Sequence, residues 1–97
     1  MSRLIVISAV WCPSCLILNK HLKKIKEEYS DLEIIKLDYD LDDEEVEKYD
    51  VGKKLPVLIL CDEDKEIRRI VGERTYEEIV KFLEGEAVWK KEKYLLV

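Results

Sequence analysis

The distribution of apolar and polar positions along the chain predicts alternating strands and helices. Residues 3–10 are nearly all apolar and rich in β-branched side chains, which is typical of a strand buried on both faces of a sheet. Residues 13–29 show apolar side chains at helical spacing with lysines between them, which predicts an amphipathic helix. The apolar positions of this helix are Leu18, Leu22, Ile25 and Tyr29.

The middle of the chain predicts one further strand and a short helix. Residues 33–37 carry three apolar side chains and predict a second strand. Asp42 or Asp43 can cap a short helix that runs to Tyr49, with acids in its first turn. Gly52 is expected to end this helix.

Residues 56–71 predict an antiparallel hairpin. Pro56 suits the first position of a strand, and the apolar residues 57–61 follow it. A polar turn at 62–65 leads into a fourth strand over 66–71, which is more polar and is expected nearer a sheet edge.

A final helix is predicted to begin at Thr75. Thr75 and Glu78 have the spacing of a capping box, and Gly85 is the glycine expected after the helix end. The last twelve positions, residues 86–97, are too apolar for a free tail and fit either an added strand or a short packed helix.

The order of these elements is βαβαββα, which predicts an α/β fold. We expect a four-stranded mixed sheet with helices on both faces. The chain has too few prolines and glycines for a linker, so a single domain over residues 1–97 is predicted. Its core is residues 3–85, and residues 86–97 form a C-terminal extension.

The charge and length of the chain exclude several classes of protein. The 97 residues carry a formal net charge of −5, which argues against general nucleic-acid binding because that needs a basic face. No apolar run approaches the roughly 18 residues of a membrane span. Eight acids lie within residues 38–50 and four lysines within residues 20–26, a distribution interpreted as two solvated faces.

The three cysteines favour a reducing compartment. They are too few for the disulfide framework of a secreted domain. The apolar stretch within residues 1–9 is too short for a signal peptide, and cleavage there would remove a predicted strand. We therefore expect a cytoplasmic protein. We also expect it to act as a monomer.

The strongest chemical signal is the segment Trp-Cys-Pro-Ser-Cys at residues 11–15, between the first strand and the first helix. Pro13 suits the first turn of that helix, and the helix N-terminus stabilises a thiolate on Cys12. Cys12 is therefore the expected nucleophile and the more exposed sulfur. Cys15, one turn further on, is expected to be buried and to act as the resolving thiol.

Other interpretations of this pair are a structural disulfide and half of a zinc site. A zinc site needs about four ligands. Cys61 and His21 remain, and neither has a partner at ligand spacing, so no metal is expected. Cys61 is interpreted as a small core residue and His21 as a surface histidine.

The element order and the Cys-x-x-Cys motif together resemble the thioredoxin superfamily over residues 3–85. Lys36 to Asp40, Pro56 and Gly72 also resemble thioredoxin in order and spacing. The resemblance implies that Pro56 is cis and faces the cysteines, so that the backbone of Leu55 can pair with an extended substrate. The substrate-binding residues that it implies are Trp11, Pro13, Ser14, Leu55, Pro56 and Gly72.

Three features depart from the thioredoxin pattern. The chain begins directly at the strand before the cysteines, without the extra N-terminal strand and helix of full thioredoxins. Pro13 and Ser14 stand between the cysteines, where thioredoxins have Gly-Pro. Residues 4–10 hold no acid, so Lys36 would lack the buried aspartate that usually accompanies it, and is expected to reach solvent.

The resemblance implies a thiol–disulfide oxidoreductase that reduces protein disulfides through a Cys12–Cys15 cycle. Such a protein needs no cofactor beyond its own cysteines. Its electron donor would be a thioredoxin reductase-like protein or glutathione. Two alternatives stay open: a glutaredoxin-like reductase fed by glutathione, and a non-catalytic module that senses redox state or binds a soft metal.

Overall fold

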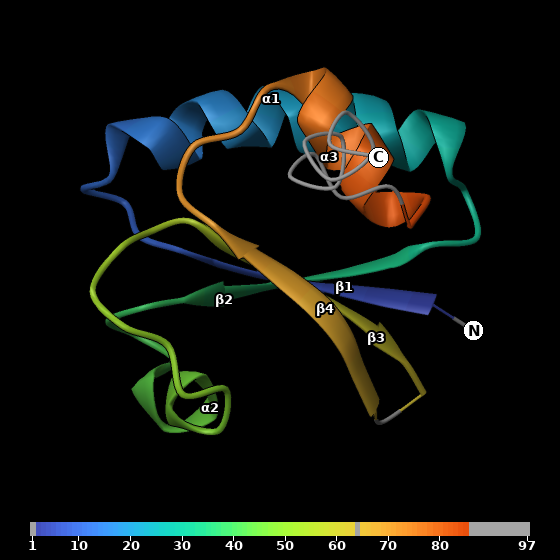
Figure 1. The fold of residues 1–97 in the computed structure, drawn as a ribbon. Helices are drawn as coiled ribbons and strands as arrows, with labels where there is room; N and C mark the ends of the chain where they lie inside the picture. The colour runs from blue at the N-terminus through green and yellow to red at the C-terminus, as the bar shows by residue number, and fades with distance from the viewer. Residues whose placement is uncertain (1, 64, 86–97) are drawn as a thin grey trace, which may run out of the picture.

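A computed structural model describes residues 2–63 and 65–85, and the described chain has the element order βαβαββα (Figure 1). The predicted order of elements is therefore confirmed. The elements are β1 (Ser2–Ser8), α1 (Pro13–Glu28), β2 (Glu33–Asp38), α2 (Asp43–Glu47), β3 (Val57–Asp62), β4 (Lys65–Val71) and α3 (Tyr76–Leu83).

The four strands form one mixed sheet in the order β2-β1-β3-β4. β1 runs parallel to β2 and antiparallel to β3, and β3 pairs antiparallel with β4. β1 and β3 therefore lie in the middle of the sheet, where their nearly continuous apolar sequences are buried. β2 and β4 are its two edges, as expected for the more polar β4.

Helices cover both faces of this sheet, as predicted (Figure 1). Successive side chains of a strand point to opposite faces, so β1 contributes to two separate cores. Leu4 and Val6 pack with α1 and α3, whereas Ile5 and Ile7 pack on the α2 side. The two cysteines of the motif belong to this second core.

The helices begin and end for reasons that the sequence indicates. Pro13 is the first residue of α1, and the predicted stripe of Leu18, Leu22 and Ile25 is fully buried. At α3, Thr75 accepts a hydrogen bond from the Glu78 N–H, while the Glu78 carboxylate accepts one from the Thr75 N–H. The predicted capping box is thus confirmed.

Two local predictions are wrong. β1 ends at Ser8, two residues earlier than expected, because the chain turns there to enter α1, and the Cys12 N–H donates to the Ala9 carbonyl. α2 is shorter than predicted and is not ended by Gly52. The residue with a left-handed backbone there is Asp50, at φ 50°.

The predictions for the tail concern residues 86–97, which lie outside the described residues. Within the described chain, no helix combines the length and the apolar character needed to cross a bilayer.

Candidate active site

The two cysteines of the motif lie at the N-terminal end of α1, after the connection from β1. Cys12 is the N-cap of α1, with an extended backbone, and Cys15 lies in the first turn, its N–H donating to the Cys12 carbonyl at 3.1 Å. Cys12 is 6 % exposed and Cys15 is 2 % exposed. The predicted order of exposure is correct, but Cys12 is also largely covered.

Burial raises the pKa of the Cys15 thiol to about 11, with a hydrogen bond to the Cys12 side chain as the next cause. A backbone hydrogen bond at Ala9 opposes this rise in part. Cys15 therefore keeps its proton at neutral pH, and its S–H faces the sulfur of Cys12. This arrangement suits a pair in which one thiol attacks first and the other follows.

No acid accompanies Lys36 in the sheet. Lys36 pairs across the sheet with Val6, and β1 contains no carboxylate at any position. The side chain of Lys36 is exposed, which confirms that it reaches solvent. Among the described residues, no carboxylate contributes to the raised pKa of Cys15.

The peptide bond between Leu55 and Pro56 is cis, as the resemblance implied. Leu55 is buried in the same core cluster as Cys12 and Cys15. The Gly72 N–H donates to the Pro56 carbonyl at 2.8 Å, so the loop after β4 is fixed to the proline segment.

Gly72 permits this close approach. Its φ is +93°, in the left-handed region that disfavours other residues. A Cβ at this position would lie 3.1 Å from Cε of Lys54. The positive φ is therefore the feature that favours glycine here, because the flexible Lys54 side chain could move away from a Cβ.

Trp11 is more than half exposed and is oriented by two neighbours. Its Nε1–H donates to Oδ2 of Asp40 at 2.7 Å. Its ring meets the ring of Tyr39 edge-on, with centroids 6.4 Å apart. The sequence did not reveal Asp40 as a site residue, because it lies within a run of acids interpreted as a solvated face.

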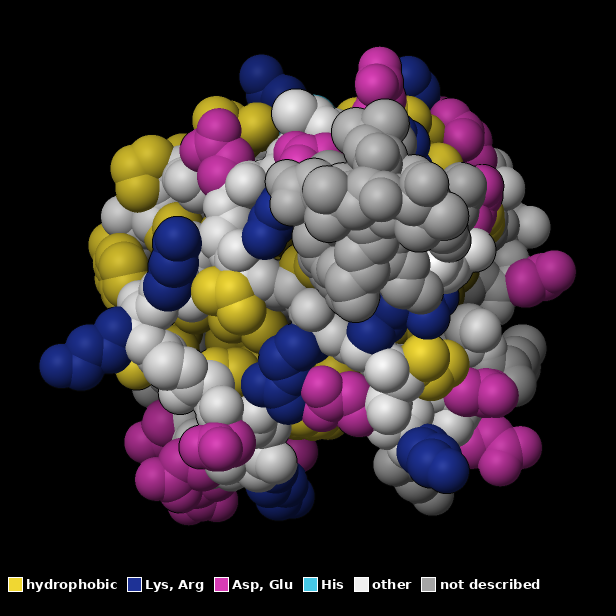
Figure 2. Space-filling view, in the orientation of Figure 1, with side chains coloured by type: hydrophobic (Ala, Val, Ile, Leu, Met, Phe, Trp, Pro, Cys, Tyr) yellow, Lys and Arg dark blue, Asp and Glu magenta, His cyan; other side chains and the backbone are white. Residues whose placement is uncertain are grey.

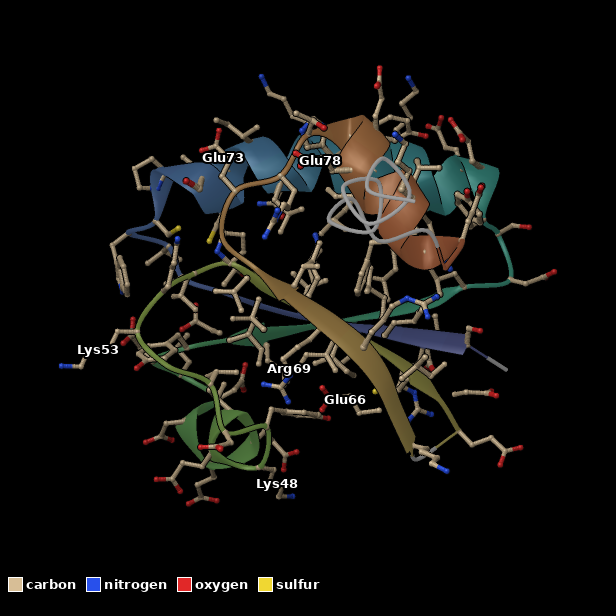
Figure 3. All side chains as sticks on the ribbon, in the orientation of Figure 1. Lys48, Lys53, Glu66, Arg69, Glu73 and Glu78 are labelled. Atoms are coloured by element: carbon tan, nitrogen blue, oxygen red, sulfur yellow. The ribbon has the colours of Figure 1, made fainter. Side chains whose placement is uncertain are left out.

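Ser14 makes a second contact that the sequence did not reveal. Its hydroxyl donates to Oε1 of Glu73 at 2.9 Å, although the two residues are 59 positions apart. Figure 3 shows Glu73 on the segment between β4 and α3, beside the first turns of α1. The one available signal was that Glu73 follows Gly72, a glycine already assigned to the site.

Exposed hydrophobic side chains surround the cysteine motif. Val10 is 82 % exposed, Trp11 and Leu16 are more than half exposed, and Ile17 is 45 % exposed. Figure 2 shows hydrophobic side chains gathered at the end of the molecule where α1 begins. We call these four residues the apolar rim; such a contiguous exposed patch is typical of a protein interaction surface.

The other candidate residues lie away from the motif. Cys61 is buried on the α2 side of the sheet, and burial raises the pKa of its thiol. His21 lies on α1 against the ring of Tyr76. Within residues 2–63 and 65–85, no three His, Cys, Asp or Glu side chains cluster as metal ligands. A cavity of about 760 Å³ between α1 and β2 is lined by neither motif cysteine.

Two thiols one helical turn apart, one of them buried and protonated, can form and release a disulfide between themselves. The fold and this pair therefore define a thiol–disulfide oxidoreductase of thioredoxin-like fold.

Comparisons with known proteins agree with this class. The thioredoxin family model matches residues 2–85. Thioredoxin-2 of Saccharomyces cerevisiae is 35 % identical over 72 residues, which cover 72 % of this chain and 68 % of the yeast protein. Thioredoxin of Chlamydia trachomatis is 32 % identical over 75 residues, covering 77 % and 72 % of the two chains.

A solved structure of thioredoxin-2 from a malaria parasite has the same fold. It superposes with a TM-score of 0.80 at 20 % identity, covering 88 % of this chain and 82 % of the parasite chain. The chain belongs to the thioredoxin family. Membership implies protein disulfides as substrates and a reductase as electron donor, and the redox group is the chain's own cysteine pair.

Proposed function

We propose that the protein reduces protein disulfides in a cycle in which Cys12 attacks and Cys15 resolves. The Cys12 thiolate attacks one sulfur of the target disulfide, and the other sulfur leaves with the electron pair and takes up a proton. Cys15 then gives up its proton and attacks the sulfur of Cys12. The Cys12–target bond breaks, the second target thiol is released, and a Cys12–Cys15 disulfide remains.

The observation that carries this assignment is the unequal position of the two thiols. Cys12 caps α1, where backbone N–H groups favour a negative charge. Cys15 lies deeper and has a pKa raised to about 11, so it remains a thiol until the mixed disulfide has formed. The order of attack follows from this difference.

The substrate would lie across the motif between the apolar rim and the Leu55 backbone. Leu55 belongs to the same buried cluster as both cysteines, and an extended chain that pairs with its N–H and C=O would bring a target sulfur to Cys12. Trp11, Pro13 and Ser14 would contact the substrate on the side of α1, and Gly72 on the side of the loop after β4.

The electron donor in this proposal is a thioredoxin reductase-like protein, with glutathione as the competing candidate. The family comparisons support the former, since the matched relatives are thioredoxins. The protein's cysteine usage favours a cytoplasmic location, and in this proposal it acts as a monomer without a further cofactor. Turnover with glutathione and glutathione reductase, but not with thioredoxin reductase, would reverse the choice of donor.

Reduction of a protein disulfide by purified protein, with dithiothreitol as recycling reductant, tests the cycle. Cys12→Ser should abolish the rate enhancement. Cys15→Ser should accumulate a mixed disulfide that mass spectrometry locates at Cys12. Cys61→Ser is the matched control and should retain turnover, because Cys61 pairs with Arg3 at the start of β1, whereas the motif follows the other end of that strand. Full activity of Cys12→Ser would show that the assigned roles are wrong.

A further inference from the structure

Two carboxylates reach the cysteine motif from distant parts of the chain. Trp11 Nε1–H donates to Asp40 at 2.7 Å, and Ser14 Oγ–H donates to Glu73 at 2.9 Å. Asp40 follows β2 and Glu73 follows β4, and these strands are the opposite edges of the sheet. The motif therefore holds one acid on each side of Cys12.

Neither acid is neutralised by a cation of the described chain. No ion pair of Asp40 or Glu73 occurs within residues 2–63 and 65–85. Several acids elsewhere do have a basic partner. These pairs are Arg3–Glu33, Lys48–Glu45, Arg69–Glu66 and Arg74–Glu78.

Two basic residues, Arg74 and Lys54, lie close to Glu73, but neither forms an ion pair with it within the described residues. Arg74 follows Glu73, but its guanidinium contacts Glu78 and the Val71 carbonyl. The side chain of Lys54 lies against Gly72. Lys53 points away from the molecule in Figure 3. Each carboxylate is thus without an ion-pair partner among the described residues, although Lys54 lies close to Glu73.

We infer that Asp40 and Glu73 are specificity residues that select target disulfides flanked by lysine or arginine. This inference rests on the proposed function, since it needs a substrate chain docked at Cys12. A substrate lying along the motif would place the side chains beside its cysteine near these two acids. Each acid has one oxygen held by the motif, and its other oxygen is available to a substrate cation.

The size of the expected preference follows from exposed ion pairs. Such pairs contribute up to about fivefold in affinity and are screened by salt. We therefore expect the preference for a basic over a neutral substrate to be about fivefold at low salt, and to shrink at about 0.5 M salt.

Three peptides provide the test. They differ only in the two residues on either side of a cysteine, which are lysine, glutamine or glutamate. The cysteine is held in a mixed disulfide with thionitrobenzoate, whose release by Cys12 is followed by absorbance. Each kcat/KM is divided by the rate of the same peptide with a small neutral thiol, because nearby charges also change the reactivity of the disulfide itself.

The variants remove charge while retaining the hydrogen bonds. Asp40→Asn and Glu73→Gln each keep an oxygen that accepts from Trp11 or Ser14. Each should lower the lysine-to-glutamate ratio by about two- to fivefold, and the double variant should bring the ratio close to one. Glu27→Gln is the control: it changes net charge equally, but at the far end of α1.

Three results would overturn the inference. If the corrected rates are equal for all three peptides, the acids do not select substrate although the reductase function stands. If Glu73→Gln slows all three peptides by one factor, the carboxylate acts on the cysteine pair and not on the substrate. If no peptide releases thionitrobenzoate, the proposed function fails and this inference fails with it.

Discussion

The two ends of α1 lie in opposite environments. At its N-terminal end, hydrophobic side chains such as Val10 and Leu16 lie in solvent. The two acids that accept hydrogen bonds from the motif form no ion pair among the described residues. At its C-terminal end, Tyr29 Oη donates to Glu84 at 2.6 Å, and Lys26 Nζ donates to the Leu32 carbonyl at 2.8 Å.

This contrast separates binding from stability along a single helix. Side chains at the C-terminal end of α1, which we call the closed end, have polar partners within the chain, so their interactions contribute to folding. The N-terminal end of α1, which we call the open end, has exposed apolar side chains and acids without an ion-pair partner among the described residues. These groups are available to a binding partner. Between the two ends, the buried stripe of α1 fixes the position of the cysteines relative to the sheet.

The largest expected effect separates Ile25 from Ile17, two isoleucines of α1. Ile25 is fully buried, so Ile25→Ala should lower the free energy of unfolding by about 3 kcal/mol through lost burial and a cavity. Ile17 is 45 % exposed in the apolar rim, and Ile17→Ala should change stability by less than about 0.5 kcal/mol. Urea unfolding measures both values.

The two variants should rank in the opposite order when their activity on a protein disulfide is compared. Ile17→Ala should lower kcat/KM for a protein disulfide by about threefold, which corresponds to roughly 0.6 kcal/mol of lost apolar contact. Ile25→Ala should leave this value unchanged where the variant is folded. Equal losses of stability in the two variants would contradict the division of α1 into a binding end and a structural stripe.

The second expected effect concerns the pH dependence of Cys15. The pKa of this thiol is raised to about 11, so its thiolate fraction should rise about hundredfold between pH 7 and pH 9. The release of target from the Cys12 mixed disulfide should accelerate by a similar factor. Burial, the largest cause of the shift, remains in the mixed disulfide after the Cys12 thiol is consumed.

Rapid mixing with acid quench, at several pH values, measures this release. The Cys61→Ala variant should show the same profile, since Cys61 is not the resolving thiol. A rate that stays flat from pH 7 to pH 9 would mean that another group accepts the proton of Cys15. Such a group would take the place of the acid that β1 lacks.

Most of the fold was predictable because the relevant signals are local. Apolar spacing along α1, the capping box at Thr75 and the short hairpin connection each depend on residues close in sequence. The errors lie where tertiary contacts decide. Asp42, one of the two predicted caps, is the N-cap of α2, but its carboxylate accepts from the Asp38 N–H and makes no capping hydrogen bond. Gly52 was expected to end this helix, but the helix ends at Glu47, and Asp50 is the residue with a left-handed backbone.

The site residues show the same distinction between local signals and tertiary contacts. Cys12 and Cys15 were predictable because the motif is contiguous and stands at the start of a predicted helix. Asp40 and Glu73 were not, because their hydrogen bonds to the motif span 29 and 59 residues. Ser14 was assigned to substrate binding by resemblance alone. The structure adds that its hydroxyl is directed at a carboxylate of another element, which no spacing rule in the sequence specifies.

The smallest expected effect tests the closed end of α1. The hydrogen bond to Glu84 raises the pKa of Tyr29 to about 12, but the pair is partly solvated, so its removal by Tyr29→Phe should cost only about 0.5–1 kcal/mol of stability. Tyr49→Phe is the matched control, since no hydrogen bond of the Tyr49 hydroxyl occurs within residues 2–63 and 65–85. Disulfide reductase activity should be the same in both variants, because Tyr29 packs in the core on the other face of the sheet, and Tyr49→Phe keeps the ring that packs against the core of the cysteines. A loss of activity in Tyr29→Phe at unchanged stability would mean that the two ends of α1 are coupled, and that the closed end positions the cysteines as well as anchoring the helix.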